Sequence, residues 1–128
     1  MPGEQEKIML SASCHCGAVQ IEIDRKPKSV TRCTCSICHR YGAQWAYYTR
    51  KSVHVSDQAG VLAAYVWGDK TIEFCHCTHC GCVTHYESIE KKDDSRIAVN
   101  ARILAPADIE DIPLRTFDGA STWKYLNE

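Results

Sequence analysis

The spacing of the cysteines constrains the fold of this chain more than any other feature of its sequence. Nine cysteines among 128 residues form three groups: Cys14-His-Cys16-Gly, Cys33-Thr-Cys35-Ser-Ile-Cys38 and Cys75-His-Cys77-Thr-His-Cys80-Gly-Cys82. Their odd number argues against a fully paired disulfide framework. In the cytoplasm, where we expect this protein, thiols stay reduced. The cysteines are therefore predicted to be metal ligands or catalytic thiols.

The segment Cys77-Thr-His-Cys80-Gly81 has the spacing of a zinc knuckle, in which a tight turn directs two thiolates at one ion. Glycine permits the backbone angles that follow the second cysteine. A tetrahedral site needs two more thiolates, and Cys14 and Cys16 can supply them. We expect a structural zinc that ties the N-terminal strand to the middle of the chain. The alternative is four free buried thiols.

Cys33, Cys35 and Cys38 remain as a set of three, and their spacing places the sulfurs on one side of a short turn. Three protein ligands with one exchangeable position are the arrangement of a catalytic zinc. We therefore predict a second, labile zinc, whose open position is the working part of the site.

Two other interpretations of this set stay open. A fourth ligand could close it into a second structural zinc, and the candidates are His39, Cys75, Cys82 and His85. Alternatively, Cys35 and Cys38 could be a redox pair, although the thioredoxin-type motif sits in a βαβ setting that this sequence does not predict.

Charge and hydropathy narrow the range of partners. The chain has 15 Lys and Arg against 16 Asp and Glu, a net charge of -1, without the basic excess typical of nucleic-acid binding. No stretch approaches the about 20 apolar residues that span a bilayer, and the N-terminus MPGEQEKIML does not resemble a signal peptide. We expect no nucleic acid, no membrane, a cytoplasmic location and a single domain over residues 1–128.

The hydrophobic pattern predicts a mainly β chain. Val19, Ile21 and Ile23 alternate with polar residues, which is typical of a half-buried strand. Other short segments rich in β-branched or aromatic residues are 44–49, 52–55, 61–67, 71–74, 83–87 and 96–100. Residues 106–111 could form one helical turn, since Pro106 suits its start.

Aromatic residues follow the second cysteine group and also occur in the tail. Trp45, Tyr47 and Tyr48 could wall a site, although aromatic residues on a strand usually belong to the core. The tail is predicted to pack onto the body, and its side chains available for burial are Phe117, Trp123, Tyr125 and Leu126.

Four segments, CHCGAVQIEI, RCTCSICHRYGA, CTHCG and FDGASTWKYL, together resemble the family of glutathione-dependent formaldehyde-activating enzymes and centromere protein V. The likeness extends over about residues 11–126. It implies a mainly β, Mss4-like fold of short antiparallel strands organised around two zinc sites. The resemblance assigns the structural zinc to Cys14, Cys16, Cys77 and Cys80, and the catalytic zinc to Cys33, Cys35 and Cys38. Cys75 and Cys82 match no ligand position and are expected to be small buried residues.

The resemblance also implies an activity, the addition of the thiol of glutathione to formaldehyde, which in reverse is a carbon–sulfur lyase reaction. Glutathione carries two carboxylates and one ammonium, so its site should offer guanidinium groups or backbone amides. Arg40, directly after the cysteine set, is the first candidate, and Arg50 and Arg102 are also present. The histidines among the cysteines are expected to support the sites or to be exposed rather than to bind zinc.

A different class of function is a non-enzymatic, zinc-stabilised module that binds a protein partner, as the centromere branch of the family allows. In such a module, both zinc ions would have four protein ligands. A homodimer formed through an exposed strand edge is compatible with either function.

Overall fold

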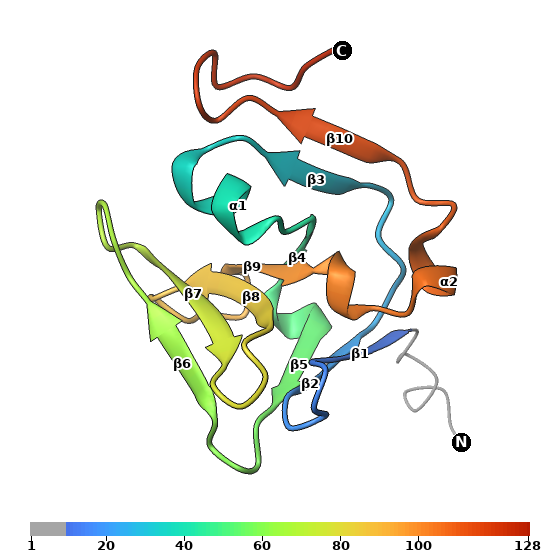
Figure 1. The fold of residues 1–128 in the computed structure, drawn as a ribbon, viewed down its shortest axis with the longest axis vertical. Helices are drawn as coiled ribbons and strands as arrows, with labels where there is room; N and C mark the ends of the chain where they lie inside the picture. Colours follow the sequence, from blue (N-terminus) through green and yellow to red (C-terminus); the bar gives the residue numbers. More distant parts are fainter. Residues whose placement is uncertain (1–9) are drawn as a thin grey trace.

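A computed structural model describes residues 10–128 of the chain. Residues 1–9, which make up most of the N-terminal segment where we expect no targeting signal, lie outside the described residues. Among the described residues, no helix is long and apolar enough to cross a membrane. The prediction of a mainly β fold of short antiparallel strands is confirmed (Figure 1), except that β3 (Val30–Cys33) and β10 (Leu114–Phe117) are parallel, as described below.

Between residues 10 and 128, ten strands form two sheets. The smaller sheet has the order β1-β2-β5, with β1 at Leu10–Ser13, β2 at Gln20–Ile23 and β5 at Val53–Ser56. The larger sheet has the order β10-β3-β4-β9-β8-β7-β6. Its strands are β10 (Leu114–Phe117), β3 (Val30–Cys33), β4 (Trp45–Thr49), β9 (Arg96–Asn100), β8 (Val83–Ser88), β7 (Ile72–Cys77) and β6 (Leu62–Tyr65).

In the part of the chain that the structure describes, helical structure is confined to short segments. The α-helices are α1 (Ser36–Tyr41) and α2 (Pro106–Ile109), and the 3-10 turns are η2 (Arg50–Ser52) and η3 (Ala101–Ile103). The expected helical turn near Pro106 is α2, which has proline in its first turn. α1 was expected only as a turn. It ends at Gly42, which adopts φ 65° and donates its N–H to the carbonyls of Cys38 and His39.

Alternation along β4 and β9 divides the larger sheet into two faces. On β4, Ala46 and Tyr48 pack into the main core together with Ile97 and Val99 of β9. The smaller sheet contributes Ile21 and Ile23 to the same cluster, so this face of the larger sheet is covered. The residues between them on β4 point to the opposite face, which holds a cavity described below.

β3 and β10 differ from the sequence-based expectation, since neither segment was predicted as a strand. They lie side by side at one end of the molecule (Figure 1). Among the strands that the structure describes, they are the one parallel pair in an otherwise antiparallel sheet. The register pairs Val30 with Leu114 and Cys33 with Phe117. This pairing brings the C-terminal tail next to the second cysteine group.

The tail packs onto the body only in part. Phe117 contacts the rings of Trp123 and Tyr125 edge-on, with centroids 5.1 Å away in each case. The Tyr125 hydroxyl lies 3.3 Å from Thr31 Oγ1. However, Trp123 is 69% exposed and Leu126 is 41% exposed, so the expected burial of these two side chains is wrong.

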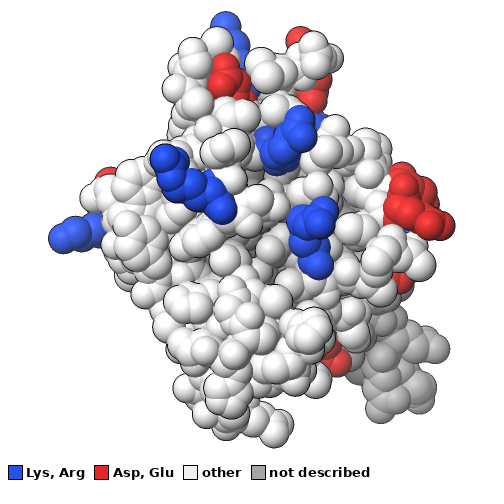
Figure 2. All heavy atoms as spheres, viewed as in Figure 1, with Lys and Arg blue, Asp and Glu red and all other residues white. Residues whose placement is uncertain are grey.

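Charged residues are spread over the surface in the view of Figure 2. Lys and Arg side chains lie apart from one another on this face, and uncharged residues cover most of its area. Several cations among the described residues pair with acids, including Lys26 with Asp111 and Arg115 with Glu128.

Candidate functional site

The three-cysteine cluster (Cys33, Cys35 and Cys38) lies where β3 ends and α1 begins. Cys33 is the last residue of β3, Cys35 caps α1, and Cys38 lies within its first turn. The three sulfur atoms lie within 4.8 Å of one another. The Cys35 sulfur accepts a hydrogen bond from the backbone N–H of Cys38 at 3.5 Å, in the manner of a helix-capping side chain. A strand end and a helix cap therefore direct the three sulfurs to one point.

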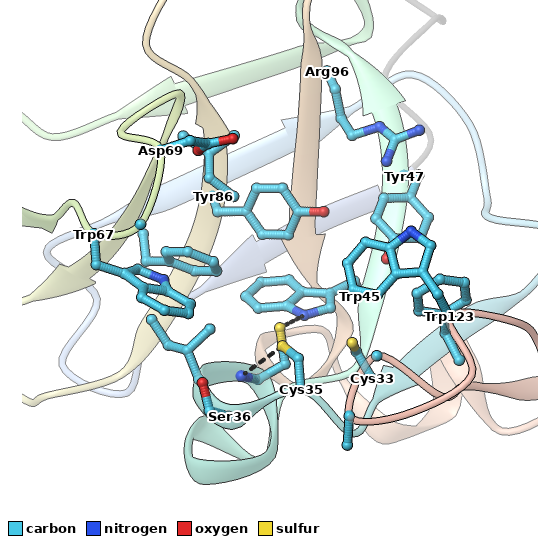
Figure 3. Close-up of a pocket in the computed structure, with 18 of the residues that line it drawn as sticks. Cys33, Cys35, Ser36, Trp45, Tyr47, Trp67, Asp69, Tyr86, Arg96 and Trp123 are labelled. Carbon is cyan, nitrogen blue, oxygen red and sulfur yellow. Dashed lines mark hydrogen bonds between the residues drawn. The ribbon is translucent and has the colours of Figure 1, made fainter.

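A buried tryptophan supports this cluster from β4. The indole N–H of Trp45 donates to the Cys38 sulfur at 3.3 Å, and Trp45 is fully buried (Figure 3). The side chain packs among aromatic neighbours, with Tyr86 edge-on at a centroid distance of 4.9 Å. Donors to ligand atoms orient ligands and adjust their basicity, so Trp45 is placed to stabilise a thiolate at Cys38.

The three thiols differ in their tendency to ionise. Burial raises the pKa of Cys33 and of Cys38, and for Cys38 the indole of Trp45 offsets only part of this effect. Burial also acts on Cys35, but hydrogen bonds from the backbone N–H and the thiol of Cys38 lower its pKa overall. Cys35 therefore ionises first, and a bound cation would allow its neighbours to follow.

The cluster opens into a cavity of about 950 Å³. In Figure 3, Cys33 and Cys35 lie at one side of this cavity and Tyr86 lies across from them. Aromatic side chains form much of its wall, and they include Trp45, Tyr47, Trp67, Tyr86, Phe117 and Trp123. Trp45 and Tyr47 therefore do line the site, whereas Tyr48 belongs to the main core.

Two charged residues line the cavity among the described residues, Arg96 and Asp69. Arg96 begins β9, and its guanidinium carbon lies 4.8 Å from the centre of the Tyr47 ring. Asp69 lies in the loop between β6 and β7, next to Trp67, on the other side of the cavity from Arg96 (Figure 3). An aromatic cavity with one cationic and one anionic side could bind a small zwitterionic or carboxylate-bearing ligand.

The arginines named from the sequence lie elsewhere. Arg40 is exposed, donates to the Ser36 carbonyl at 2.8 Å, and lines a neighbouring groove with Tyr65 and Trp67. Arg50 pairs with Glu87 at 3.1 Å, and Arg102 is exposed. The sequence predicts only that Arg96 begins a strand and does not indicate that it lines the cavity. Its position depends on the register of β9 against β4, which pairs Ala98 with Tyr47.

None of the proposed fourth ligands joins the three-cysteine cluster. Within residues 10–128, that cluster contains no further Cys, His, Asp or Glu. His39 is exposed, Cys82 packs beside the first cysteine group, and Cys75 and His85 form a separate cluster with Glu87. The redox-pair interpretation lacks its expected setting, because β3 and β4 on either side of α1 are antiparallel.

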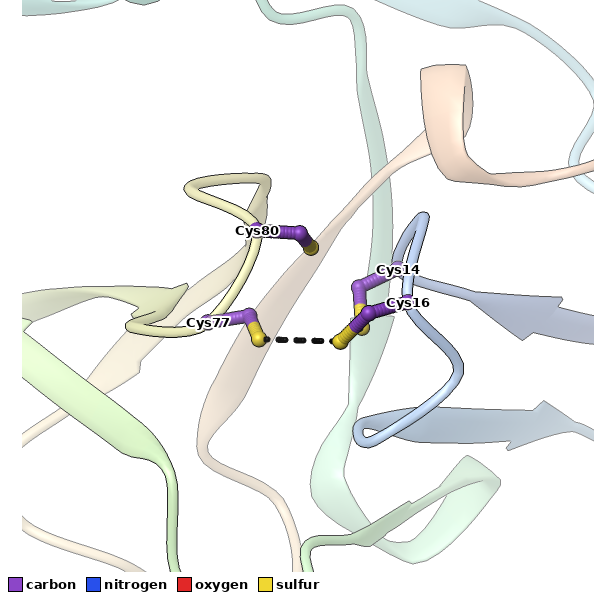
Figure 4. Close-up of side chains that lie close together, drawn as sticks. All are labelled: Cys14, Cys16, Cys77 and Cys80. Atoms are coloured by element: carbon purple, nitrogen blue, oxygen red, sulfur yellow. Dashed lines mark hydrogen bonds between the residues drawn. The ribbon is translucent and has the colours of Figure 1, made fainter.

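The four-cysteine cluster (Cys14, Cys16, Cys77 and Cys80) joins two turns that are far apart in the sequence (Figure 4). Its four sulfur atoms lie within 4.8 Å of one another. The Cys16 sulfur is 3.7 Å from that of Cys14 and 3.6 Å from that of Cys77. These spacings are close to the edge of a tetrahedron with metal–sulfur bonds of about 2.3 Å.

Both turns of this cluster use glycine for the same reason. Gly17 (φ 84°) and Gly81 (φ 82°) follow Cys16 and Cys80 in the left-handed region. Each glycine donates its N–H back across the turn, Gly17 to the Cys14 carbonyl and Gly81 to the Cys77 carbonyl. The backbone thus folds each cysteine pair around one point.

The thiols of this cluster also ionise unequally. Backbone N–H groups of Cys82 and Cys16 lower the pKa of Cys80 to about 5. The N–H of Ala18 lowers the pKa of Cys16, but desolvation and the thiols of Cys77, Cys14 and Cys80 outweigh it and raise that pKa to about 12. Four adjacent thiolates repel one another, and a divalent cation would compensate their charge.

The chemistry of both donor sets fits zinc. Among the residues that the structure describes, all nine cysteines are free, so no disulfide competes for these sulfurs. Four convergent thiols match the closed set of a structural zinc, and three beside a cavity match the open set of a catalytic one. Each cluster could hold a metal ion.

Comparisons with known proteins identify a family for this chain. The family model described as glutathione-dependent formaldehyde-activating enzyme matches residues 9–112. A Rhodobacter sphaeroides protein of known crystal structure is 32% identical to this chain in sequence, and the two structures superpose with a TM-score of 0.67. The match covers 82% of this chain and 99% of that one. No curated protein matches the chain. The chain therefore belongs to the family of glutathione-dependent formaldehyde-activating enzymes, as the cysteine motifs indicated.

Proposed function

We propose that this protein is a zinc-dependent carbon–sulfur lyase of the formaldehyde-activating type, which adds the thiol of glutathione to formaldehyde or a related small aldehyde. One observation carries the proposal. Three sulfurs converge beside an aromatic cavity, and no fourth protein ligand joins them among residues 10–128. Membership of the family supports the same activity.

The reaction needs no oxidant or reductant. The sulfur of the thiol forms a bond to the carbonyl carbon, the carbon–oxygen double bond becomes single, and the proton of the thiol ends on the oxygen. The reverse reaction breaks the carbon–sulfur bond and returns thiol and aldehyde. A free thiol has a pKa of about 8.5 and is mostly protonated at neutral pH, so the site must favour the thiolate.

Cys33, Cys35 and Cys38 would hold the zinc, which supplies an open position that favours the thiolate form of a bound thiol. The indole N–H of Trp45 on the Cys38 sulfur would fix that ligand and take up part of its charge. The largely aromatic walls of the cavity would limit the access of water to the reacting atoms.

Arg96 and Asp69 would orient glutathione in the cavity. Arg96 is the cation of the lining and can bind a carboxylate with two parallel hydrogen bonds, while Asp69 can bind the ammonium. This assignment replaces Arg40 as the first candidate, because Arg40 lines a different groove and donates to the Ser36 carbonyl.

Tyr47 and Tyr86 would supply hydrogen bonds to the aldehyde oxygen. Both line the cavity, and burial raises the pKa of each, so both hydroxyls keep their protons at neutral pH. A hydroxyl in a water-poor cavity stabilises negative charge as it develops on oxygen in the transition state. The four-cysteine cluster lies apart from this cavity and would hold a second, structural zinc.

The activity is tested by following formaldehyde consumption in the presence of glutathione, against the spontaneous reaction in buffer. Wild type is expected to exceed the background, and Cys35→Ser is expected to return to it. Cys82→Ser is the matched control, because Cys82 belongs to neither metal cluster. Equal rates for wild type, Cys35→Ser and buffer would refute the proposal.

A further inference from the structure

A third cluster of ligand-type side chains lies away from both cysteine clusters. It consists of Cys75, His85 and Glu87, whose sulfur, ring nitrogen and carboxylate oxygen all lie within 4.8 Å of one another. All three are buried, with exposures of 5%, 1% and 9%. From these residues we propose a third metal site, which binds a borderline-soft divalent cation such as zinc through one thiolate, one imidazole and one carboxylate.

The sheet register brings these residues together. β7 and β8 are neighbours (Figure 1), and Cys75 is paired directly with His85. Glu87 lies two residues further along β8, so it points to the same face as His85. His85 is in turn paired with Val99 of the main core, whereas Tyr86 is paired with Ala98 on the cavity face. The third cluster therefore lies on the face opposite to the cavity.

A bulge in β8 positions the histidine. Val83 pairs with His76 and His85 pairs with Cys75, so Thr84 has no partner on β7. Thr84 is fully buried, and its hydroxyl contacts both the Cys75 carbonyl at 3.3 Å and His85 Nδ1 at 2.8 Å. If the hydroxyl donates to the carbonyl, it accepts the Nδ1 proton of His85. Nε2 is then left with a free lone pair, as metal ligation requires.

The other ligands are oriented in a comparable way. His85 Nε2 lies 3.4 Å from Glu87 Oε2, a separation that suits two ligands of one zinc ion. The second carboxylate oxygen, Oε1, accepts a hydrogen bond from Arg50 Nε at 3.1 Å. Arg50 therefore holds the carboxylate with Oε2 directed at the imidazole. Ligands of metal sites are commonly fixed by such outer hydrogen bonds.

The side chains around the third cluster balance its charge. The Cys75 thiol donates to Glu73 Oε2 at 3.7 Å. Arg50 pairs with Glu87, and Lys91 pairs with Glu73 at 3.0 Å. These two cations offset the two carboxylates. A divalent cation that replaces the thiol proton would therefore leave only one net positive charge in this buried setting.

The inference does not depend on the proposed function, because this cluster takes no part in the cavity. The test loads the full-length, reduced protein with cadmium and records a cadmium NMR spectrum, in which the chemical shift falls as sulfur ligands are replaced by nitrogen and oxygen. We expect one resonance in the range of a single sulfur ligand, in addition to those of the sulfur-rich clusters. Its absence from wild type, when the sulfur-rich resonances are present, would overturn the proposal.

Variants then assign the resonance. His85→Gln and Glu87→Gln are expected to lose or shift it and to leave the sulfur-rich resonances in place, whereas Cys82→Ser is expected to retain it. A resonance that stays unchanged in both His85→Gln and Glu87→Gln would also overturn the proposal. The wild-type spectrum gives a result even where a core variant fails to fold. A protein that lacks formaldehyde activity but keeps this resonance would contradict the proposed function of the cavity and not the third metal site.

Discussion

Gly119 in the C-terminal tail lies directly against Cys33 of β3. A Cβ atom added to Gly119 would be 2.7 Å from the Cys33 sulfur and 3.0 Å from Cys35 Cβ, closer than van der Waals contact allows. The tail thus closes over the three-cysteine cluster, although it follows the segment matched by the family model. The structure explains a glycine here by space rather than by backbone angle, since Gly119 is not among the glycines with positive φ.

Gly119→Ala is expected to move the tail or the cysteines and to weaken metal binding at the three-cysteine cluster. Overpacking of this kind costs about 1–3 kcal/mol. Ser121→Ala in the same loop is the control, because the Ser121 side chain is exposed. The measurement is a competitive zinc titration of both variants. Equal zinc affinities in wild type and Gly119→Ala would contradict the close contact.

Trp45→Phe removes the indole N–H from the Cys38 sulfur and leaves space in a buried aromatic cluster. We expect zinc to leave the three-cysteine cluster faster in the variant, together with a loss of about 1–3 kcal/mol of folding free energy. Trp67→Phe is matched to it, since Trp67 lines the same cavity but is 42% exposed. Chelator-driven zinc release and urea unfolding measure the two effects. Identical release from wild type and Trp45→Phe would show that the hydrogen bond has no influence.

Cys77→Ser removes one ligand of the four-cysteine cluster, where Cys77 is fully buried. Loss of a structural metal belongs to the mechanisms that cost more than about 4 kcal/mol, so the variant should unfold at much lower temperature or fail to fold. Cys82→Ser, a few residues along the same turn, should bind as much zinc as wild type. Thermal unfolding with a metal analysis of each preparation makes the comparison. A Cys77→Ser protein as stable as wild type would argue against a structural ion.

Arg96→Ala is expected to raise the KM for glutathione about tenfold, as loss of a charge-assisted hydrogen bond implies, with a smaller effect on kcat. A thiol without carboxylates, such as 2-mercaptoethanol, should react equally well with wild type and variant. Arg40→Ala is the control on the other groove. If Arg40→Ala raised this KM and Arg96→Ala did not, the assignment made from the sequence would be correct and the present one wrong.

Asp118 organises the tail loop and gives a pH-dependent prediction. Its carboxylate accepts hydrogen bonds from the Thr122 N–H and hydroxyl at 3.1 and 3.0 Å and from the Thr34 hydroxyl at 3.0 Å. These bonds, with the Thr122 N–H contributing most, lower the pKa of Asp118. Because the pKa of Asp118 is lower in the folded than in the unfolded protein, its stabilisation is complete above the ordinary pKa of aspartate. The stabilisation is lost as the pH falls below that value and through the lowered pKa of the folded protein.

Asp118→Asn should therefore have a lower Tm than wild type at pH 7. The difference should shrink as the pH falls from about 5 toward and below the ordinary pKa of aspartate, about 3.9. Thermal unfolding of both proteins across this range, at fixed metal content, gives the comparison. A difference in Tm that grew on acidification would have the wrong sign for this account.

The sequence predicted the strands whose alternation is regular, and it could not predict those that depend on distant pairing. β2 carries apolar residues at every second position, β4 and β9 are rich in aromatic or β-branched residues, and these strands form the centre of the fold. β3 and β10 have four residues each, and they pair with each other although they are far apart in the sequence. The local sequence of β10, LRTF, does not indicate that this segment pairs in parallel with β3, VTRC.

The same limit applies to the site. Motif spacing was enough to group the cysteines into sets of four and three, because neighbouring ligands come from single turns. Arg96 and Trp123 could not be placed, since their positions depend on sheet register and on the path of the tail. Cys75 is buried as expected, whereas Cys82 is only partly buried, so that expectation is wrong for Cys82. The position of Cys75 opposite His85 follows from the pairing of β7 with β8.

The central claim is that Cys33, Cys35 and Cys38 hold a metal with one position free for an incoming thiol. The most direct measurement is a glutathione titration of the cobalt-substituted protein, followed by visible absorption. We predict a saturable change in the cobalt spectrum of wild type that is absent in Cys35→Ser and present in Cys82→Ser. A wild-type spectrum that glutathione leaves unchanged would mean that the position is filled by the protein, as in a non-enzymatic module, and would contradict the account.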